Sequence, residues 1–149
     1  MANAHAIPAQ PISPAWRQAL GALGLLLGWI LFLYRDTGLA MVDIWSRSDT
    51  FTHAFLVPPI TLWLIWRQRS LLLAHTPQPN LWATLAIVVV AFGWLLGDLV
   101  AVNAVTQLAL VTLLVIAVPA VLGFTVARLI TFPLLFMFFA VPIGDFLMP

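Results

Sequence analysis

The chain of 149 residues is 63% hydrophobic and 7% charged, with a formal net charge of +1. A water-soluble domain cannot hide that much apolar surface, so the composition predicts a polytopic integral membrane protein. All six cations are arginines, all five acidic residues are aspartates and cysteine is absent, which excludes a P-loop lysine, an HExxH zinc helix and a thiol nucleophile within these residues.

The N-terminal region is predicted to be a tail followed by a first membrane span. Residues 1–16 contain three prolines and no charge, which is typical of a disordered tail. Residues 18–34 are uncharged and lie between Arg17 and Arg35, so they are long enough to cross a bilayer. Gly24 and Gly28 form a GxxxG step, which we expect to let another helix approach closely.

The next region carries the candidate polar site. Residues 35–47 mix charged and apolar side chains, as expected of a short amphipathic segment on the membrane surface. Residues 49–69 form the second predicted span, and a helix of that length measures about 31 Å. Pro58 and Pro59 are expected to kink it.

Asp49 and His53 stand at the polar end of this second span. They are four residues apart, so in a helix they share one face. One interpretation is an ordinary capped end at the membrane interface, where polar groups cost little. The other is that both side chains face a water-filled cavity on the outer side.

Three further spans are predicted at residues 81–97, 99–123 and 124–145, for a total of about five in an all-α bundle that occupies residues 17–149. Asn103, Thr106 and Gln107 form a polar stripe on the fourth span, for which interhelical hydrogen bonding and a substrate path are the two alternatives. Asp145 lies at the foot of the fifth span and is the third candidate for an outward-facing cavity.

The arginines predict the orientation of the bundle. One set of alternate ends carries cations and the other set carries every aspartate; the cations are Arg17, Arg67, Arg69 and Arg128 and the acids are Asp36, Asp43, Asp49, Asp98 and Asp145. The positive-inside rule then places the N-terminal tail in the cytoplasm and the aspartates outside. So few arginines do not make a nucleic-acid surface, and no cofactor or metal site is predicted.

Two stretches resemble one known family. They are TFTHAFLVPPITLWLIWRQR at residues 50–69 and ITFPLLFMFFAVPIGDFLMP at residues 130–149. Both are similar in order and spacing to segments of the exosortases, those of the A type in particular. The resemblance implies a multi-pass cysteine peptidase or transpeptidase of the bacterial inner membrane, whose partners are membrane lipid and substrate proteins with a C-terminal PEP-CTERM signal.

The family's catalytic Cys, Arg and His lie after the matched region, so the resemblance assigns no catalytic residue to this chain. We therefore expect the N-terminal part of a longer exosortase, inactive alone because it has no cysteine. The alternative is a complete small membrane protein, such as a transporter half or an assembly factor, which the broken helices and the polar stripe would also fit.

Overall fold

The computed structural model describes residues 13–49 and 51–142, and within these ranges every regular element is a helix. This confirms the all-α prediction for the described part of the chain. The elements in order are α1 (Pro14–Leu33), α2 (Arg35–Arg47), the 3-10 helix η1 (Thr52–Leu56), α3 (Val57–Arg67), α4 (Arg69–Leu73), α5 (Leu81–Leu99), α6 (Asn103–Leu122), α7 (Phe124–Leu129), α8 (Thr131–Phe136) and the 3-10 helix η2 (Met137–Ala140).

Three helices in the described ranges, α1, α5 and α6, are long and apolar enough to cross a membrane. Each has 19 or 20 residues, which corresponds to about 30 Å. Side-chain caps set two of their starts: the Ser13 hydroxyl accepts a hydrogen bond from the Trp16 amide at 3.3 Å, and Asn80 Oδ1 accepts one from the Ala83 amide at 3.0 Å. Because Ser13 caps the helix, α1 begins inside the predicted tail, whose residues 1–12 lie outside the described ranges.

The second and fifth predicted spans are not continuous helices of spanning length. Residues 49–69 contain a turn at Asp49, then η1 and the 11-residue α3. Pro58 and Pro59 lie in the first turn of α3 and do not kink it, because backbone amides there have no partner within the helix. The region 124–145 is divided into α7, α8 and η2, with a break at Ile130, and its last residues lie outside the described ranges.

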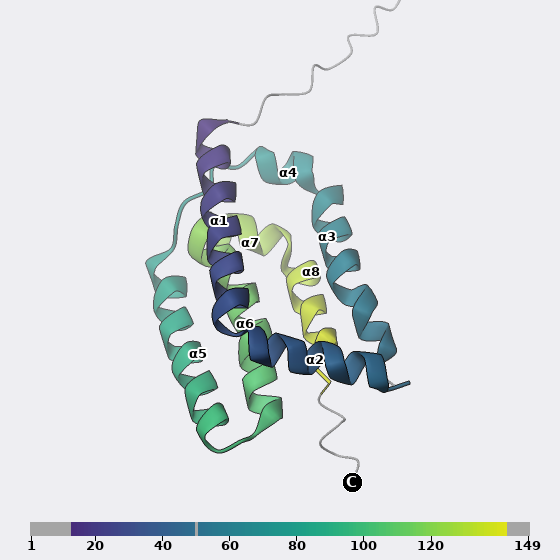
Figure 1. Ribbon diagram of the computed structural model, residues 1–149. Helices are drawn as coiled ribbons and strands as arrows, with labels where there is room; N and C mark the ends of the chain where they lie inside the picture. Colours follow the sequence, from purple (N-terminus) through teal and green to yellow (C-terminus); the bar gives the residue numbers. More distant parts are fainter. Residues whose placement is uncertain (1–12, 50, 143–149) are drawn as a thin grey trace, which may run out of the picture.

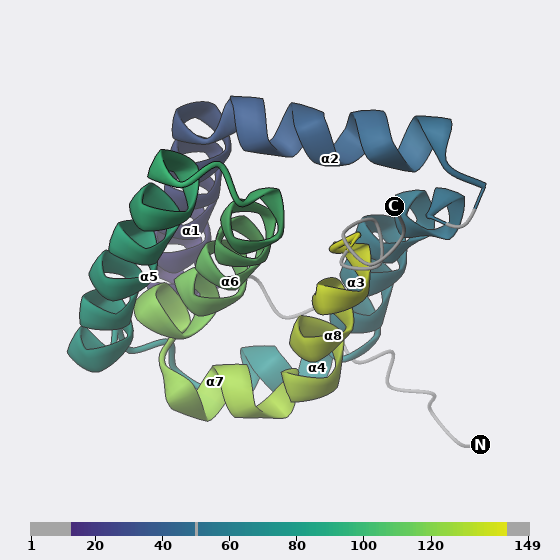
Figure 2. The same cartoon turned by 90° about the horizontal axis from the view of Figure 1, so that it is seen from below.

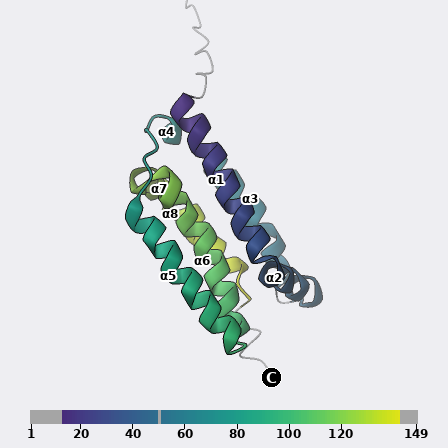
Figure 3. The same ribbon diagram turned by 60° about the vertical axis from the view of Figure 1, so that its left-hand side comes forward.

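The helices run back and forth between two ends of the molecule (Figure 1). α1 runs down from the N-terminal end, α2 crosses at the lower end, and α3 returns antiparallel to α1 (Figure 1). Seen from below, α2 and α7 lie along opposite edges, with α1, α5 and α6 on one side and α3 and α8 on the other (Figure 2). Seen from the side, α6 lies between α5 and the α1–α2 arm (Figure 3).

The core is centred on α6, which packs against α1, α2, α5, α7 and η2. Most of its side chains are buried, among them Leu113 and Ala117. By contrast α1 and α5 expose large apolar side chains such as Leu25, at 79%, and Val89, at 69%. Such a surface is stable in lipid and not in water, so the protein is a membrane protein.

Glycine contacts join α5 to α6 and not, as predicted, α1 to a neighbour. A Cβ placed on Gly97 would lie 2.6 Å from Val105 Cγ1, so α5 and α6 approach closely only because residue 97 has no side chain. No atom outside their own helix lies within 4 Å of a Cβ placed on Gly24 or Gly28. The GxxxG step of α1 therefore faces outward from the described chain.

Candidate functional site

The lower end of the molecule brings together two segments that are distant in the sequence. α3 packs against α8 and η2, and η1 contacts η2. These elements belong to the residue ranges 50–69 and 130–149, which are the two stretches that resemble one family. A functional site is therefore expected at the contact between them.

Trp45 of α2 fixes this contact from the side. Its side chain is 8% exposed, and its indole Nε1 donates a hydrogen bond of 2.8 Å to the carbonyl oxygen of Ala140 in η2. The same indole meets the Phe55 ring of η1 edge to face, with 5.4 Å between ring centroids. One side chain thus connects α2, η1 and η2.

Trp45 reaches this position because α2 is amphipathic, as predicted. Thr37, Met41 and Trp45 are spaced four residues apart and are all buried on one face. The opposite face carries the exposed ion pair between Arg47 and Asp43, at 2.7 Å. The apolar face packs on the bundle, which the sequence prediction of a surface segment did not anticipate.

A small cavity opens between α3 and the α8–η2 segment. Its volume is about 240 Å³, and it is lined by His53, Leu56, Val57, Ile60, Phe136 and Phe139. That is below the roughly 300–1,000 Å³ of most small-molecule sites, so it fits a single side chain better than a whole ligand. The imidazole of His53 is the one titratable group in its lining.

The three candidate cavity residues do not lie in one place in the structure. His53 lines this cavity from η1, whereas Asp49 lies exposed in the turn that follows α2 and is not part of the lining. Asp145 lies outside the described residues. A shared outward-facing cavity of Asp49, His53 and Asp145 therefore stays a prediction.

Thr61 is a candidate that the sequence did not single out. It lies one turn along α3 from Val57 and is 4% exposed, yet its hydroxyl has no hydrogen-bond partner within the described ranges. Leaving a buried hydroxyl unpaired costs about 1–3 kcal/mol, which makes it a candidate for an interaction with a bound group. The available signal was a lone threonine within the otherwise apolar run of α3.

The polar stripe of α6 is partly buried. Thr106 and Gln107 are 6% and 2% exposed, whereas Asn103 is exposed at the start of the helix. The Thr106 hydroxyl donates to the Asn103 carbonyl at 2.9 Å, within its own helix. For Thr106 the predicted bond to a neighbouring helix is thus replaced by a local one.

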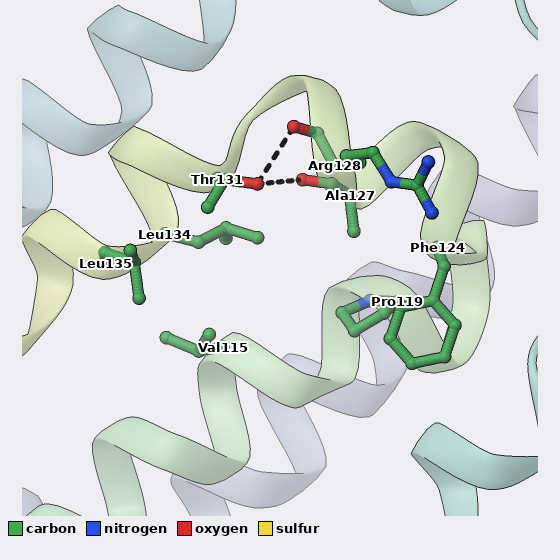
Figure 4. A pocket seen from close by; sticks show the side chains of 8 residues that line it. All are labelled: Val115, Pro119, Phe124, Ala127, Arg128, Thr131, Leu134 and Leu135. Carbon is green, nitrogen blue, oxygen red and sulfur yellow. Dashed lines mark hydrogen bonds between the residues drawn. The ribbon is translucent and has the colours of Figure 1, made fainter.

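A second cavity, of about 280 Å³, lies at the opposite end between α6 and the α7–α8 segment. Figure 4 shows Arg128 at its rim, with the guanidinium extending toward Phe124 and away from Leu134. The Thr131 hydroxyl is held by the carbonyls of Arg128, at 2.9 Å, and Ala127, at 3.5 Å (Figure 4). The exposed Arg128 suits the anchoring role predicted for it, and the lining contains no acidic side chain.

No group of three or more histidine, cysteine, aspartate or glutamate side chains that could hold a metal ion occurs within residues 13–49 and 51–142. The site at the lower end is therefore an apolar contact with one histidine at its edge. In chemical terms it can receive an apolar side chain and offer an imidazole beside it.

The comparison with protein families gives one match. The model described as "Transmembrane exosortase" matches residues 45–149. The match begins at Trp45 and covers both segments that meet at the lower end, whereas α1 and most of α2 precede it. No curated protein matches the chain, and no solved structure does.

Proposed function

Because the chain belongs to the transmembrane exosortase family, we propose that it forms the membrane-embedded scaffold of a peptidase or transpeptidase that processes proteins with a C-terminal PEP-CTERM sorting signal. Such a signal combines a Pro-Glu-Pro motif, a membrane helix and a basic tail. The observation that best supports the proposal is the contact of α3 with α8 and η2, joined to α2 by Trp45. Trp45, α3, α8 and η2 all lie within the family match.

The proposed chemistry needs a thiolate that these residues do not contain. The 149-residue sequence has no cysteine, so these residues alone cannot form an acyl-enzyme on sulfur. We assign the catalytic cysteine, arginine and histidine to residues outside this sequence. Within it, Asp49, His53 and Asp145 are proposed to line an outward-facing cavity beside the incoming signal.

We propose that the protein lies in the bacterial inner membrane with its arginine-rich end in the cytoplasm. The start of α1, the end of α3 and α4 lie at the upper end of the molecule, and α7 lies below them in the upper half (Figure 1). They carry Arg17, Arg67, Arg69 and Arg128, whereas Asp36, Asp43 and Asp98 belong to the opposite end. Topology reporters test this: a fusion after Gln78 should report the cytoplasm and one after Ala101 the periplasm.

The function is tested by deleting the gene and following a PEP-CTERM protein of the same cell by its electrophoretic mobility. The unprocessed precursor should accumulate in the deletion strain, and the native gene should restore processing. Unchanged processing in the deletion strain would contradict the proposal. Reading the encoding DNA tests the assignment of the thiol: an in-frame cysteine followed by an arginine and a histidine is expected beyond codon 149.

A further inference from the structure

Residues of α1, α3 and α4 line an apolar groove at the arginine-rich end. Figure 1 shows how these three helices are arranged. The volume of the groove is about 720 Å³, within the roughly 300–1,000 Å³ typical of sites for small molecules. Every residue that lines it is hydrophobic except Arg69; the side chains that matter here are Trp16, Leu20, Leu62, Trp63 and Trp66. It is a different place from the cavity beside His53, which lies at the other end of α3.

At the upper end of the groove, a hydrogen bond joins α1 to the residues that follow α4. Trp16 is 4% exposed, and its indole Nε1 donates a hydrogen bond of 2.7 Å to the carbonyl oxygen of His75. Leu72 of α4 is buried in the same apolar cluster as Trp16. The hydrogen bond of Trp16 and the packing of Leu72 hold α4 over the groove, with Arg69 in its lining.

The side wall of the groove is formed by side chains that the described chain leaves more than half exposed. Leu62, Trp63 and Trp66 are 69%, 55% and 63% exposed. Tryptophans prefer the level of the lipid headgroups, and a leucine on the same wall prefers acyl chains. The side chains of this wall thus suit a lipid whose headgroup lies beside the tryptophans and whose acyl chain lies beside the leucine.

Two arginines stand at this end without an acidic partner in the described part of the chain. Arg69 lies over the Trp66 ring at 4.6 Å and donates to the Trp66 carbonyl at 3.1 Å, and Arg67 lies over the Trp63 ring at 4.9 Å. The one ion pair among the described residues joins Arg47 and Asp43, which belong to the opposite end. Positive charge therefore collects beside the groove uncompensated.

We propose that this groove binds one anionic phospholipid of the leaflet at the arginine-rich end. An acyl chain lies along Leu20 and Leu62, and the phosphate accepts hydrogen bonds from Arg69, with Arg67 close by. Under the orientation proposed above this is the cytoplasmic leaflet, where anionic lipids attract basic groups. A second copy of the chain in the same orientation would bring its own arginines to this level, where like charges repel.

The test is native mass spectrometry of the full protein, purified in detergent, with either phosphatidylglycerol or phosphatidylcholine added. The native protein should retain phosphatidylglycerol roughly tenfold more tightly, because this lipid carries a net negative charge, whereas the choline cation neutralises the phosphate of phosphatidylcholine and is repelled by Arg67 and Arg69. Arg69→Gln should reduce that preference to near equality.

The matched control is Arg35→Gln. Arg35 also lies over an aromatic ring, that of Phe32 at 5.0 Å, and also donates to the carbonyl three residues back, at 3.1 Å, but it is outside the groove. It should leave the lipid preference unchanged. Equal retention of both lipids by the native protein, or an equal loss in the two variants, would overturn the proposal.

The acyl-chain part of the proposal has its own test. Leu62→Trp should fill the groove and weaken the binding of both lipids, whereas Val89→Trp on α5 should not. Both native side chains are 69% exposed, so neither change disturbs the packed interior. Unchanged binding in Leu62→Trp would place the lipid elsewhere and contradict the proposal.

Discussion

The α5–α6 pair and the α3–α7–α8 region differ in the continuity of their helices. α5 and α6 are continuous helices of spanning length, held together by close backbone approach at Gly97. The α3–α7–α8 region uses short helices that prolines and a glycine start or stop. Interrupted backbone inside a membrane has to be enclosed by protein. The short helices η1 and η2, which adjoin α3 and α8, contact Trp45, and η1 carries His53 of the cavity.

The comparison suggests that one region supplies stability and the other supplies the site. If so, changes at the junction of the two should be the most harmful, changes within α5–α6 should lower stability alone, and changes at Trp45 should affect mainly the interrupted region. Three substitutions separate these effects. For each, the change in the free energy of unfolding can be measured by unfolding with sodium dodecyl sulfate in mixed micelles.

The largest effect is expected from Gly123→Ala, at the junction of α6 and α7. Gly123 has φ of +88°, and a Cβ there would collide with the carbonyl oxygen of Gln78. The Gln78 and Asn80 amides cap the end of α6 by donating to the Leu122 and Ala120 carbonyls, at 3.1 and 3.2 Å. Strain and collision together should lower the free energy of unfolding by about 3 kcal/mol or more.

Gly28→Ala is the control for that change, because nothing outside its helix lies within 4 Å of the added carbon. It should leave the free energy of unfolding the same, or raise it by less than about 1 kcal/mol. Equal losses in the two variants would show that the junction has no special role.

The next largest effect is expected from Gly97→Ala within the α5–α6 pair. The added methyl group would lie 2.6 Å from Val105 Cγ1 and 2.9 Å from Val105 Cβ, so the two helices have to move apart. We expect a loss of about 2 kcal/mol. Gly93→Ala on the same helix meets nothing within 4 Å and should be neutral; a neutral Gly97→Ala would instead mean that α5 and α6 do not touch there.

The smallest effect is expected from Trp45→Phe. The phenyl ring keeps the contact with Phe55 but cannot donate, so the Ala140 carbonyl loses its 2.8 Å hydrogen bond. The loss should be about 1 kcal/mol. Trp82→Phe, at a side chain that is 76% exposed on α5, should cost nothing measurable. If both variants behave alike, Trp45 does not join α2 to η2.

Hydropathy was sufficient to predict that α1, α5 and α6 exist, although α1 starts inside the predicted tail. The bilayer sets the length of such helices, and Ser13 and Asn80 mark two of their starts. The predicted span 124–145 differs from the structure because the backbone is interrupted at Ile130. The predicted span 49–69 differs because a proline pair has two local solutions. Pro58 and Pro59 can kink a helix that is already running or begin a new one, and the packing of α2 through Trp45, which no local pattern contains, requires a turn before them.

The site was only partly predictable because it depends on contacts between segments that are distant in the sequence. The polar character of His53 was visible in the sequence, but its apolar surroundings come from Phe136 and Phe139, far along the chain. The burial of Trp45 had a local signal in the four-residue spacing of Thr37, Met41 and Trp45. Its partner Ala140 had none, because a backbone carbonyl carries no sequence information.

The most direct test of the account is whether α3 and α8 touch in the membrane. These 149 residues contain no cysteine, so Ile60→Cys with Phe136→Cys forms a single reactive pair across the His53 cavity, provided that any cysteine encoded beyond residue 149 is replaced by serine. A short bifunctional thiol reagent, applied to membranes, should join the two peptides, as detected by mass spectrometry after digestion, and should fail with Ile60→Cys paired with Val89→Cys. If the second pair is joined and the first is not, the two family-like segments do not meet and the proposed scaffold is wrong.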